Sequence, residues 1–192
     1  KILRKIKIKL PHSQTMLVEN IGRDTLPLIK KLEHIKNFNY ESICIIHSKK
    51  STYREDGESL RNNLYNALLG NEKIIQNIIN EFKNNKNIGL IAPKNCLLKH
   101  DHTTMVLNKK NVLLACKKTK LSFRKSTFPA GSMFWVRPQA LDPLLKLKDE
   151  DFEIEEGYTD GCMAHAIERL FCICVESFNL KVISTQSNKI YF

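Results

Sequence analysis

Two continuous apolar runs, separated by two segments of helical periodicity, constrain the fold of this 192-residue chain more than any other feature. The runs cover residues 42–46 and 88–92, and their lack of polar alternation is typical of strands that are buried on both faces. Residues 59–69 and 72–82 lie between them, are separated by Gly70-Asn71, and carry apolar side chains at helical spacing. Strands that alternate with helices predict an α/β fold with a mainly parallel sheet flanked by helices.

The remaining segments also fit strands and helices. Apolar and charged residues alternate strictly over residues 5–10, which predicts a half-buried strand. Residues 94–127, the least regular part, are expected to form a long loop or an excursion. No repeat and no linker divides the chain, so residues 1–192 are expected to form a single domain, as a whole protein or as a fragment of a longer one. The other predicted elements are strands at 16–18, 132–136 and 180–185 and helices at 26–35, 139–147 and 160–174, with 112–116 fitting either class.

The six cysteines and the start of the chain indicate a cytoplasmic protein. The cysteines show no Cys-x-x-Cys pair and several lie in apolar runs, so we expect reduced core residues and no zinc site. Residues 1–10 lack the apolar core of a signal peptide, and no apolar run approaches the ~20 residues that span a bilayer.

A net charge of +11, from 31 Lys and Arg against 20 Asp and Glu, predicts an anionic partner. Nucleic acid, a membrane surface and a phosphorylated ligand all fit that charge, and so does a lysine-rich solvated surface. Basic blocks at residues 1–9 and 109–125 contain no acid. These blocks lack interleaved aromatic residues, which weakens the case for RNA, and we expect no nucleic-acid partner.

Three polar clusters follow predicted strands, where an open α/β sheet binds its ligands. Lysines and serines after residue 46 suit a diphosphate, although a solvated basic turn fits equally. The first cluster also fits a capped helix with Asp24 as its N-cap and Arg23 on the surface, or a phosphate clamp through Arg23. The candidate binding residues are Asn20, Gly22, Arg23 and Asp24, then His47, Lys49, Lys50 and Ser51, and finally Ala130, Gly131 and Ser132.

The third cluster lies in residues 128–137, which read Phe-Pro-Ala-Gly-Ser-Met-Phe-Trp-Val-Arg. Three small residues let a ligand approach the main chain, and Phe134 or the single tryptophan, Trp135, is expected to shape a pocket wall. A tight turn leading into a core strand is the alternative.

An acidic segment, residues 151–160, precedes the last predicted helix. Asp160 at the helix start is a candidate N-cap and a candidate general base for a hydroxyl. His165 is a candidate substrate contact or a structural residue, whereas Glu168 is expected to be a bracing or surface charge. His100-Asp101-His102 offers no third metal ligand and is expected to be a solvated loop.

Four stretches together resemble the rhamnan synthesis protein F family, bacterial glycosyltransferases of lipopolysaccharide and cell-wall polysaccharide assembly. They cover residues 20–24, 46–51, 130–138 and 156–171, most of the chain. The resemblance implies a GT-A-like, Rossmann-type domain that transfers a sugar such as rhamnose from a nucleotide-diphosphate donor to a lipid-linked saccharide acceptor at the inner membrane. Because little precedes Asn20, part of the usual N-terminal nucleotide-binding unit is expected to be missing.

The resemblance also implies roles for the candidate residues. Asp160 matches the acidic residue that serves as base in inverting enzymes, and Lys49 and Lys50, with Arg23, are expected to hold the diphosphate. Where related enzymes carry an Asp-x-Asp motif this chain has His47-Ser48-Lys49, so weak or no dependence on Mg²⁺ or Mn²⁺ is expected. The alternative is a partial or inactive domain that binds an anionic ligand or a membrane surface.

Overall fold

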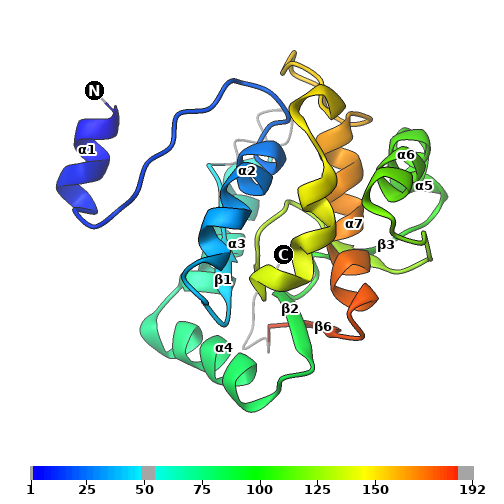
Figure 1. Ribbon diagram of the computed structural model, residues 1–192. Helices are drawn as coiled ribbons and strands as arrows, with labels where there is room; N and C mark the ends of the chain where they lie inside the picture. The colour runs from blue at the N-terminus through cyan, green and yellow to red at the C-terminus, as the bar shows by residue number, and fades with distance from the viewer. Residues whose placement is uncertain (1, 49–54, 186–192) are drawn as a thin grey trace.

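A four-stranded sheet forms the centre of the computed structural model, which describes residues 2–48 and 55–185 (Figure 1). Its order is β1 (Ile43–Ile45), β5 (Phe134–Val136), β2 (Ile88–Ala92) and β6 (Lys181–Ser184). β5 runs antiparallel to both β1 and β2, and only β2 and β6 pair in parallel. A small second sheet pairs β3 (Leu97–Lys99) with β4 (Thr127–Pro129) in antiparallel register.

The expectation of a mainly parallel sheet is therefore wrong, although the fold is a mixed α/β one. β1 and β2 do run in the same direction, because helices α3 (Gly57–Leu69) and α4 (Glu72–Asn84) form a crossover between them. β5 comes later in the chain and inserts between these two strands. Because it runs in the opposite direction, it pairs antiparallel with each of them. The GT-A-like, Rossmann-type arrangement is not confirmed by this strand order.

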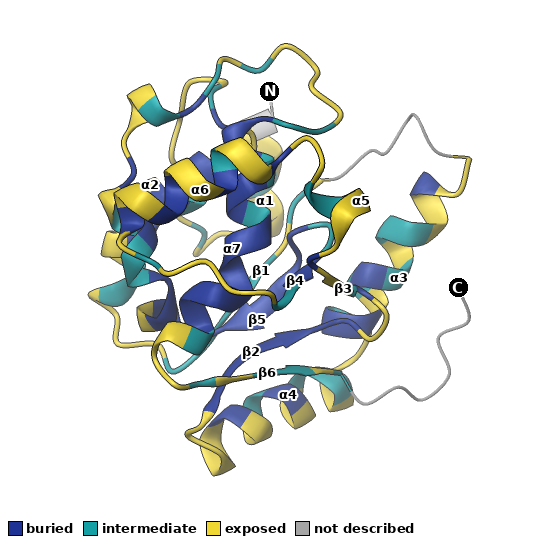
Figure 2. Cartoon of the chain, turned by 90° about the vertical axis from the view of Figure 1, so that its right-hand side faces the viewer, coloured by how far each residue is buried: buried dark blue, intermediate teal, exposed yellow. Residues whose placement is uncertain are grey.

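Side chains of the sheet alternate between two hydrophobic clusters, one on each face. Leu90 and Phe134 point into the larger cluster, and their neighbours Ile91 and Trp135 point into the smaller one. Helix α7 (Met163–Ser177) fills the larger cluster together with α2 (Thr25–Lys36), α6 (Lys109–Thr119) and the 3₁₀ segment η1 (Pro138–Lys146). Helices α3 and α4 cover the other face, so the molecule has three layers, as Figure 2 shows by the dark buried strands between helices.

The helices α2, α3, α4 and α7 confirm their predictions, but the N-terminal region differs. Residues 5–10 were expected to form a strand, but residues 5–9 belong to helix α1 (Ile2–Lys9), which stands away from the body in Figure 1. An alternating pattern makes a half-buried strand only when a sheet edge is available, and α1 has none beside it. Residues 16–18 form no strand and are exposed.

Residues 94–127 are more regular than expected. They contain β3, a short helix α5 (His102–Met105) and α6, which includes the ambiguous residues 112–116. The run at β1 is only half-buried because β1 is the edge strand of the sheet. All six cysteines are free, and five of them are buried, as predicted. Within the described ranges, every helix is too short or too polar to cross a membrane.

Candidate functional site

A pocket of about 1120 Å³ opens where the loops after β1 and before β5 meet the first turns of α7. It brings together residues from three of the predicted stretches and from the acidic segment before α7. Asn20 and Gly22 do not line it, and Lys49, Lys50 and Ser51 lie outside the described residues. The predicted site residues in its wall are Arg23, Asp24, His47, Ala130, Gly131, Ser132, Asp160 and His165.

A left-handed turn at Gly22-Arg23 forms the first part of the wall. Both residues have positive φ, 63° and 56°, and a Cβ at Gly22 would lie 2.6 Å from the Leu26 Cβ. A bridge between Ile21 and Ile154 fixes this turn against the acidic segment. Positive φ at an arginine is uncommon and is retained where the surroundings enforce it, so we infer that the turn is held in one conformation.

The Arg23 guanidinium contacts the segment before α7 and the first turn of that helix. It donates to the Tyr158 carbonyl, lies 3.0 Å from His165 Nε2, and lies 3.5 Å from the Glu155 carboxylate. A guanidinium can only donate, so His165 accepts at Nε2 and carries its proton on Nδ1, which lies 3.0 Å from Cys162 Sγ. Arg23 therefore orders one rim of the pocket.

His47 ties the loop after β1 to the turn before β5. Its Nε2 donates to the Gly131 carbonyl at 2.8 Å and lies 3.5 Å from the Asp24 carboxylate, while the Tyr65 hydroxyl donates to the His47 carbonyl at 2.8 Å. The expectation that Asp24 caps α2 is half right. Asp24 occupies the N-cap position, but its side chain makes no capping hydrogen bond and lines the pocket instead.

Glu168 holds the turn at residues 130–132 and was missed as a site residue. Its Oε1 accepts from the Gly131 N–H at 2.6 Å and lies 3.4 Å from the Ser132 hydroxyl. Gly131 and Ser132 have φ of 89° and 54°, the left-handed conformation that this contact stabilises. The only sequence signal was the position of Glu168 three residues after His165, on one side of the helix.

Asp160 does not cap α7, contrary to the expectation. The helix begins at Met163, whose N–H donates to Glu153 Oε2 at 2.9 Å, so Glu153 supplies the charge at that end. Asp160 instead faces the pocket and accepts from Asn108 Nδ2 at 2.9 Å. Asn108 is fully buried, and its contact with the candidate site was not predicted from the sequence.

Arg169, which is buried, joins the two carboxylates of the wall. It lies 2.6 Å from Glu168 and 3.4 Å from Asp160, and it donates to the His165 carbonyl at 3.0 Å. Its guanidinium also stacks over the Phe128 ring, with 4.9 Å to the ring centroid. Asp160 and Glu168 thus have orientations fixed by a buried cation and by neutral donors, an arrangement suited to accepting hydrogen bonds from a bound molecule.

Comparisons with known proteins identify the family of this chain. The sequence profile of the family described as Rhamnan synthesis protein F matches residues 1–178. This chain belongs to the rhamnan synthesis protein F family. The name of the family refers to the synthesis of rhamnan, a polysaccharide.

Two relatives of this family member come from Xanthomonas campestris pv. campestris, strains B100 and ATCC 33913, and both carry the name "Uncharacterized protein WxcX". Each is 35% identical over 173 residues, which cover 88% of this chain. The chain spans 24%, about a quarter, of the length of each relative. No solved structure gives a significant match.

Phe134 and Trp135 of this rhamnan synthesis protein F member lie in the core and do not line the pocket. Phe134 packs on Phe171, with ring centroids 4.8 Å apart, and Trp135 donates from Nε1 to the Leu68 carbonyl at 3.2 Å. The stretch around them is a turn leading into a core strand, which was the alternative interpretation. Of this stretch, Phe128 and the small residues 130–132 line the pocket.

The charges of the pocket wall are almost balanced. Two arginines, Arg23 and Arg169, face three carboxylates, Asp24, Asp160 and Glu168, and both arginines already contact carboxylates. In the part of the chain that the structure describes, no other lysine or arginine lines the pocket and no group of side chains has the arrangement of a metal site. The described wall is therefore better suited to hydroxyl groups than to a diphosphate.

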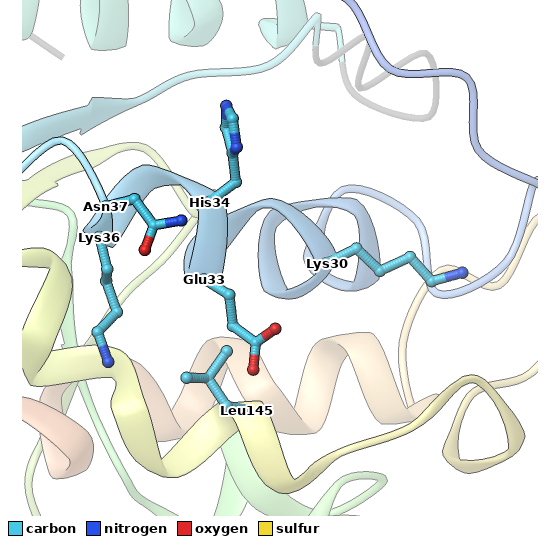
Figure 3. Close-up of a pocket in the computed structure, with 6 residues that line it drawn as sticks. All are labelled: Lys30, Glu33, His34, Lys36, Asn37 and Leu145. Carbon is cyan, nitrogen blue, oxygen red and sulfur yellow. The ribbon is translucent and has the colours of Figure 1, made fainter.

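A second hollow, of about 560 Å³, lies between α2 and η1 (Figure 3). Its polar side chains diverge in Figure 3 instead of converging on one point, and its lysines are paired, Lys30 with Asp149 and Lys36 with Asp142. Ligand sites need convergent polar groups. We therefore place the candidate site in the larger pocket.

Proposed function

We propose that this protein is a glycosyltransferase that moves a sugar, rhamnose or a similar hexose, from a nucleotide-diphosphate donor to a growing polysaccharide or lipopolysaccharide. The observation that carries the proposal is the Asp160 carboxylate, which faces the pocket and is oriented by Asn108 and Arg169. A carboxylate held in this way accepts the proton of an acceptor hydroxyl as that oxygen attacks the sugar. Membership of a family associated with rhamnan synthesis supports the same reaction class.

The two ends of the donor require different surroundings. The described wall, with its carboxylates and the small turn at residues 130–132, suits the sugar and the acceptor hydroxyl. The diphosphate needs cations, and Lys49 and Lys50 directly follow the pocket residue Ser48 in the chain. In our proposal these lysines neutralise the diphosphate as it leaves, and the reaction depends weakly or not at all on Mg²⁺ or Mn²⁺.

The proposed reaction is a single displacement with inversion at the anomeric carbon. The acceptor oxygen forms the new bond, the bond to the diphosphate breaks, and the acceptor proton passes to Asp160. We place the reaction in the cytoplasm, where a lipid-linked saccharide at the inner membrane would serve as acceptor. Retention of anomeric configuration in the product would contradict this mechanism.

The test is sugar transfer from a panel of nucleotide sugars by the wild-type chain and by Asp160→Asn. We expect Asp160→Asn to lose at least about 100-fold in kcat while its thermal unfolding midpoint stays close to that of the wild type. Asp149→Asn is the matched control, because Asp149 pairs with Lys30 outside the pocket.

A thermal-shift screen with the same nucleotide sugars comes first, since a bound donor raises the unfolding temperature. No shift with any donor would favour a partial or inactive domain that binds an anionic ligand.

A further inference from the structure

Helix α6 presents an exposed face on which leucines alternate with lysines. Lys110, Leu113, Leu114 and Lys117 recur at spacings of three, four and seven residues, and all four are exposed. The opposite face carries Val112, Ala115, Cys116 and Thr119 at the same spacings, is buried, and packs on α7 and η1. The exposed leucines are therefore not needed for packing within the described chain.

The loop that leads into α6 extends this apolar surface. Val106 and Leu107 are 72% and 61% exposed, and Leu113 and Leu114 are 49% and 41% exposed. All four lie between residues 106 and 114 of the chain, and α6 turns exposed residues to the viewer in Figure 2. Exposed apolar groups of this kind mark surfaces that meet a partner.

The charge around this group has one sign. Lys109, Lys110, Lys117 and Lys120 are all exposed, and the sequence contains no Asp or Glu between Asp101 and Asp142. Lys118 is the one lysine of this helix paired with a carboxylate that the structure records, that of Asp151. The lysines of this face complement a partner surface with anionic groups on its outside. The leucines complement an apolar layer that lies directly beneath those groups.

We propose that the exposed face of α6, with Val106 and Leu107, docks on an anionic lipid membrane. Leu113 and Leu114 enter the boundary between headgroups and acyl chains, while the lysine stems lie along that boundary and place their ammonium groups among the lipid phosphates. Anionic headgroups attract basic residues held near the membrane, so the charge complements the apolar contact. The proposal concerns an interaction surface and does not depend on sugar transfer.

The docking face is joined directly to the candidate site. Asn108 and Asn111, which lie at the start of α6, donate to Asp160 and to the Gly161 carbonyl, both at 2.9 Å. A Cβ at Gly161 would lie 3.4 Å from Leu107. A membrane against this face would therefore lie beside the pocket wall that carries Asp160.

The experiment is co-sedimentation of the 192-residue chain with vesicles that contain about one third phosphatidylserine, and with vesicles of phosphatidylcholine alone. We expect binding to the anionic vesicles only, and release at about 0.5 M NaCl. Charge reversal by Lys110→Glu with Lys117→Glu should weaken partitioning by at least about tenfold. Leu113→Ser with Leu114→Ser should weaken it by a similar factor without changing the net charge.

Helix α1 supplies matched controls on the opposite side of the molecule, as Figure 1 shows. Lys5→Glu with Lys9→Glu makes the same change in net charge, and Leu3→Ser with Leu10→Ser removes two other exposed leucines, one in α1 and one directly after it. We expect both α1 pairs to retain binding within about threefold. Binding lost in the α1 pairs and kept in the α6 pairs would overturn the proposal, as would equal binding to neutral vesicles or no binding to either kind. Thermal unfolding of each variant shows that the fold is retained.

Discussion

Asn108 donates from Nδ2 to Asp160 Oδ1 at 2.9 Å, and this contact joins the buried start of α6 to the carboxylate in the pocket wall. Asn108 is fully buried, and its Nδ2 also lies 3.4 Å from the Thr104 carbonyl. Its own Oδ1 is buried and has no hydrogen-bond partner among the residues that the structure describes. A buried amide with an unsatisfied oxygen costs free energy of folding, and the contact with Asp160 is the basis on which we predict a positioning role for Asn108.

Replacing Asn108 by leucine should reduce activity far more than stability. Asp160 loses a donor that fixes its orientation, so we expect kcat for sugar transfer to fall about 10-fold to 100-fold with KM nearly unchanged. The free energy of unfolding should fall by less than about 1.5 kcal/mol, because the lost hydrogen bond is partly offset by removal of the unsatisfied oxygen. Steady-state kinetics and urea denaturation of the same samples measure both quantities.

Asn111→Leu is the control for that variant. Asn111 makes a hydrogen bond of the same length from the same helix, but to the Gly161 carbonyl and not to a carboxylate. We expect its kcat to stay within about threefold of the wild type. Equal losses of kcat in the two variants would remove the positioning role from Asn108.

Gly22 and Gly157 provide a paired test of backbone conformation against packing. Both have positive φ, 63° and 81°, so alanine at either position should cost about 1 kcal/mol through strain alone. At Gly22 the new Cβ would also meet Leu26 at 2.6 Å and Phe152 at 2.7 Å, whereas at Gly157 nothing lies within 4 Å. We expect Gly22→Ala to destabilise the protein by about 2–4 kcal/mol in total. Chemical denaturation that gave equal losses for the two variants would contradict the packing argument.

The local elements of this fold could be predicted from the sequence, but the strand order could not. Apolar spacing located α2, α3, α4 and α7, and the alternation of strands and helices predicted the crossover between β1 and β2. Whether two such strands are neighbours depends on a segment that is far away in the sequence. Residues 134–136 insert between them, and no local pattern encodes that insertion.

The candidate site was predictable where loops follow or precede strands, and not where helices contribute buried charges. His47 and Gly131 lie close together because they flank the ends of the neighbouring strands β1 and β5, whereas Arg23 reaches the same pocket from a turn that follows no strand in the described chain. Glu168 followed by Arg169 has the pattern of a surface ion pair, and only the packing of α7 turns both toward the pocket. His100 was expected in a solvated loop, yet it is buried and stacked on Phe128.

The thiols should be unreactive in the folded protein. Burial raises the pKa of Cys96 to about 11 and that of Cys44 and Cys172 to about 12, and it also raises the pKa of Cys162. Only the thiolate is nucleophilic, so at pH 8 these groups react slowly even where a reagent reaches them. We expect iodoacetamide to leave the native chain essentially unlabelled and to label all six cysteines in denaturant. Rapid labelling of Cys96, the one cysteine in the pocket wall, under native conditions would contradict this.

His100 should make stability depend on pH below neutrality. Its Nε2 donates to the Arg169 carbonyl at 2.9 Å and its Nδ1 accepts from the Ser126 N–H at 3.2 Å, so the neutral ring satisfies both partners. Burial lowers the pKa of His100, and the charge of the nearby Arg169 lowers it further, against the opposing effects of hydrogen bonds to backbone groups of Arg169 and Arg124 and of the Glu176 charge. The unfolded chain therefore binds a proton at this residue at a higher pH than the folded chain does. Stability should fall as the pH drops below about 6.5, the ordinary pKa of histidine, and continue to fall until the folded protein also binds the proton.

His100→Gln, which keeps a donor and an acceptor but does not titrate, should flatten this dependence of stability on pH between about pH 7 and pH 5. Urea denaturation across that range measures the slope, and an unchanged slope in His100→Gln would assign the pH dependence to other groups.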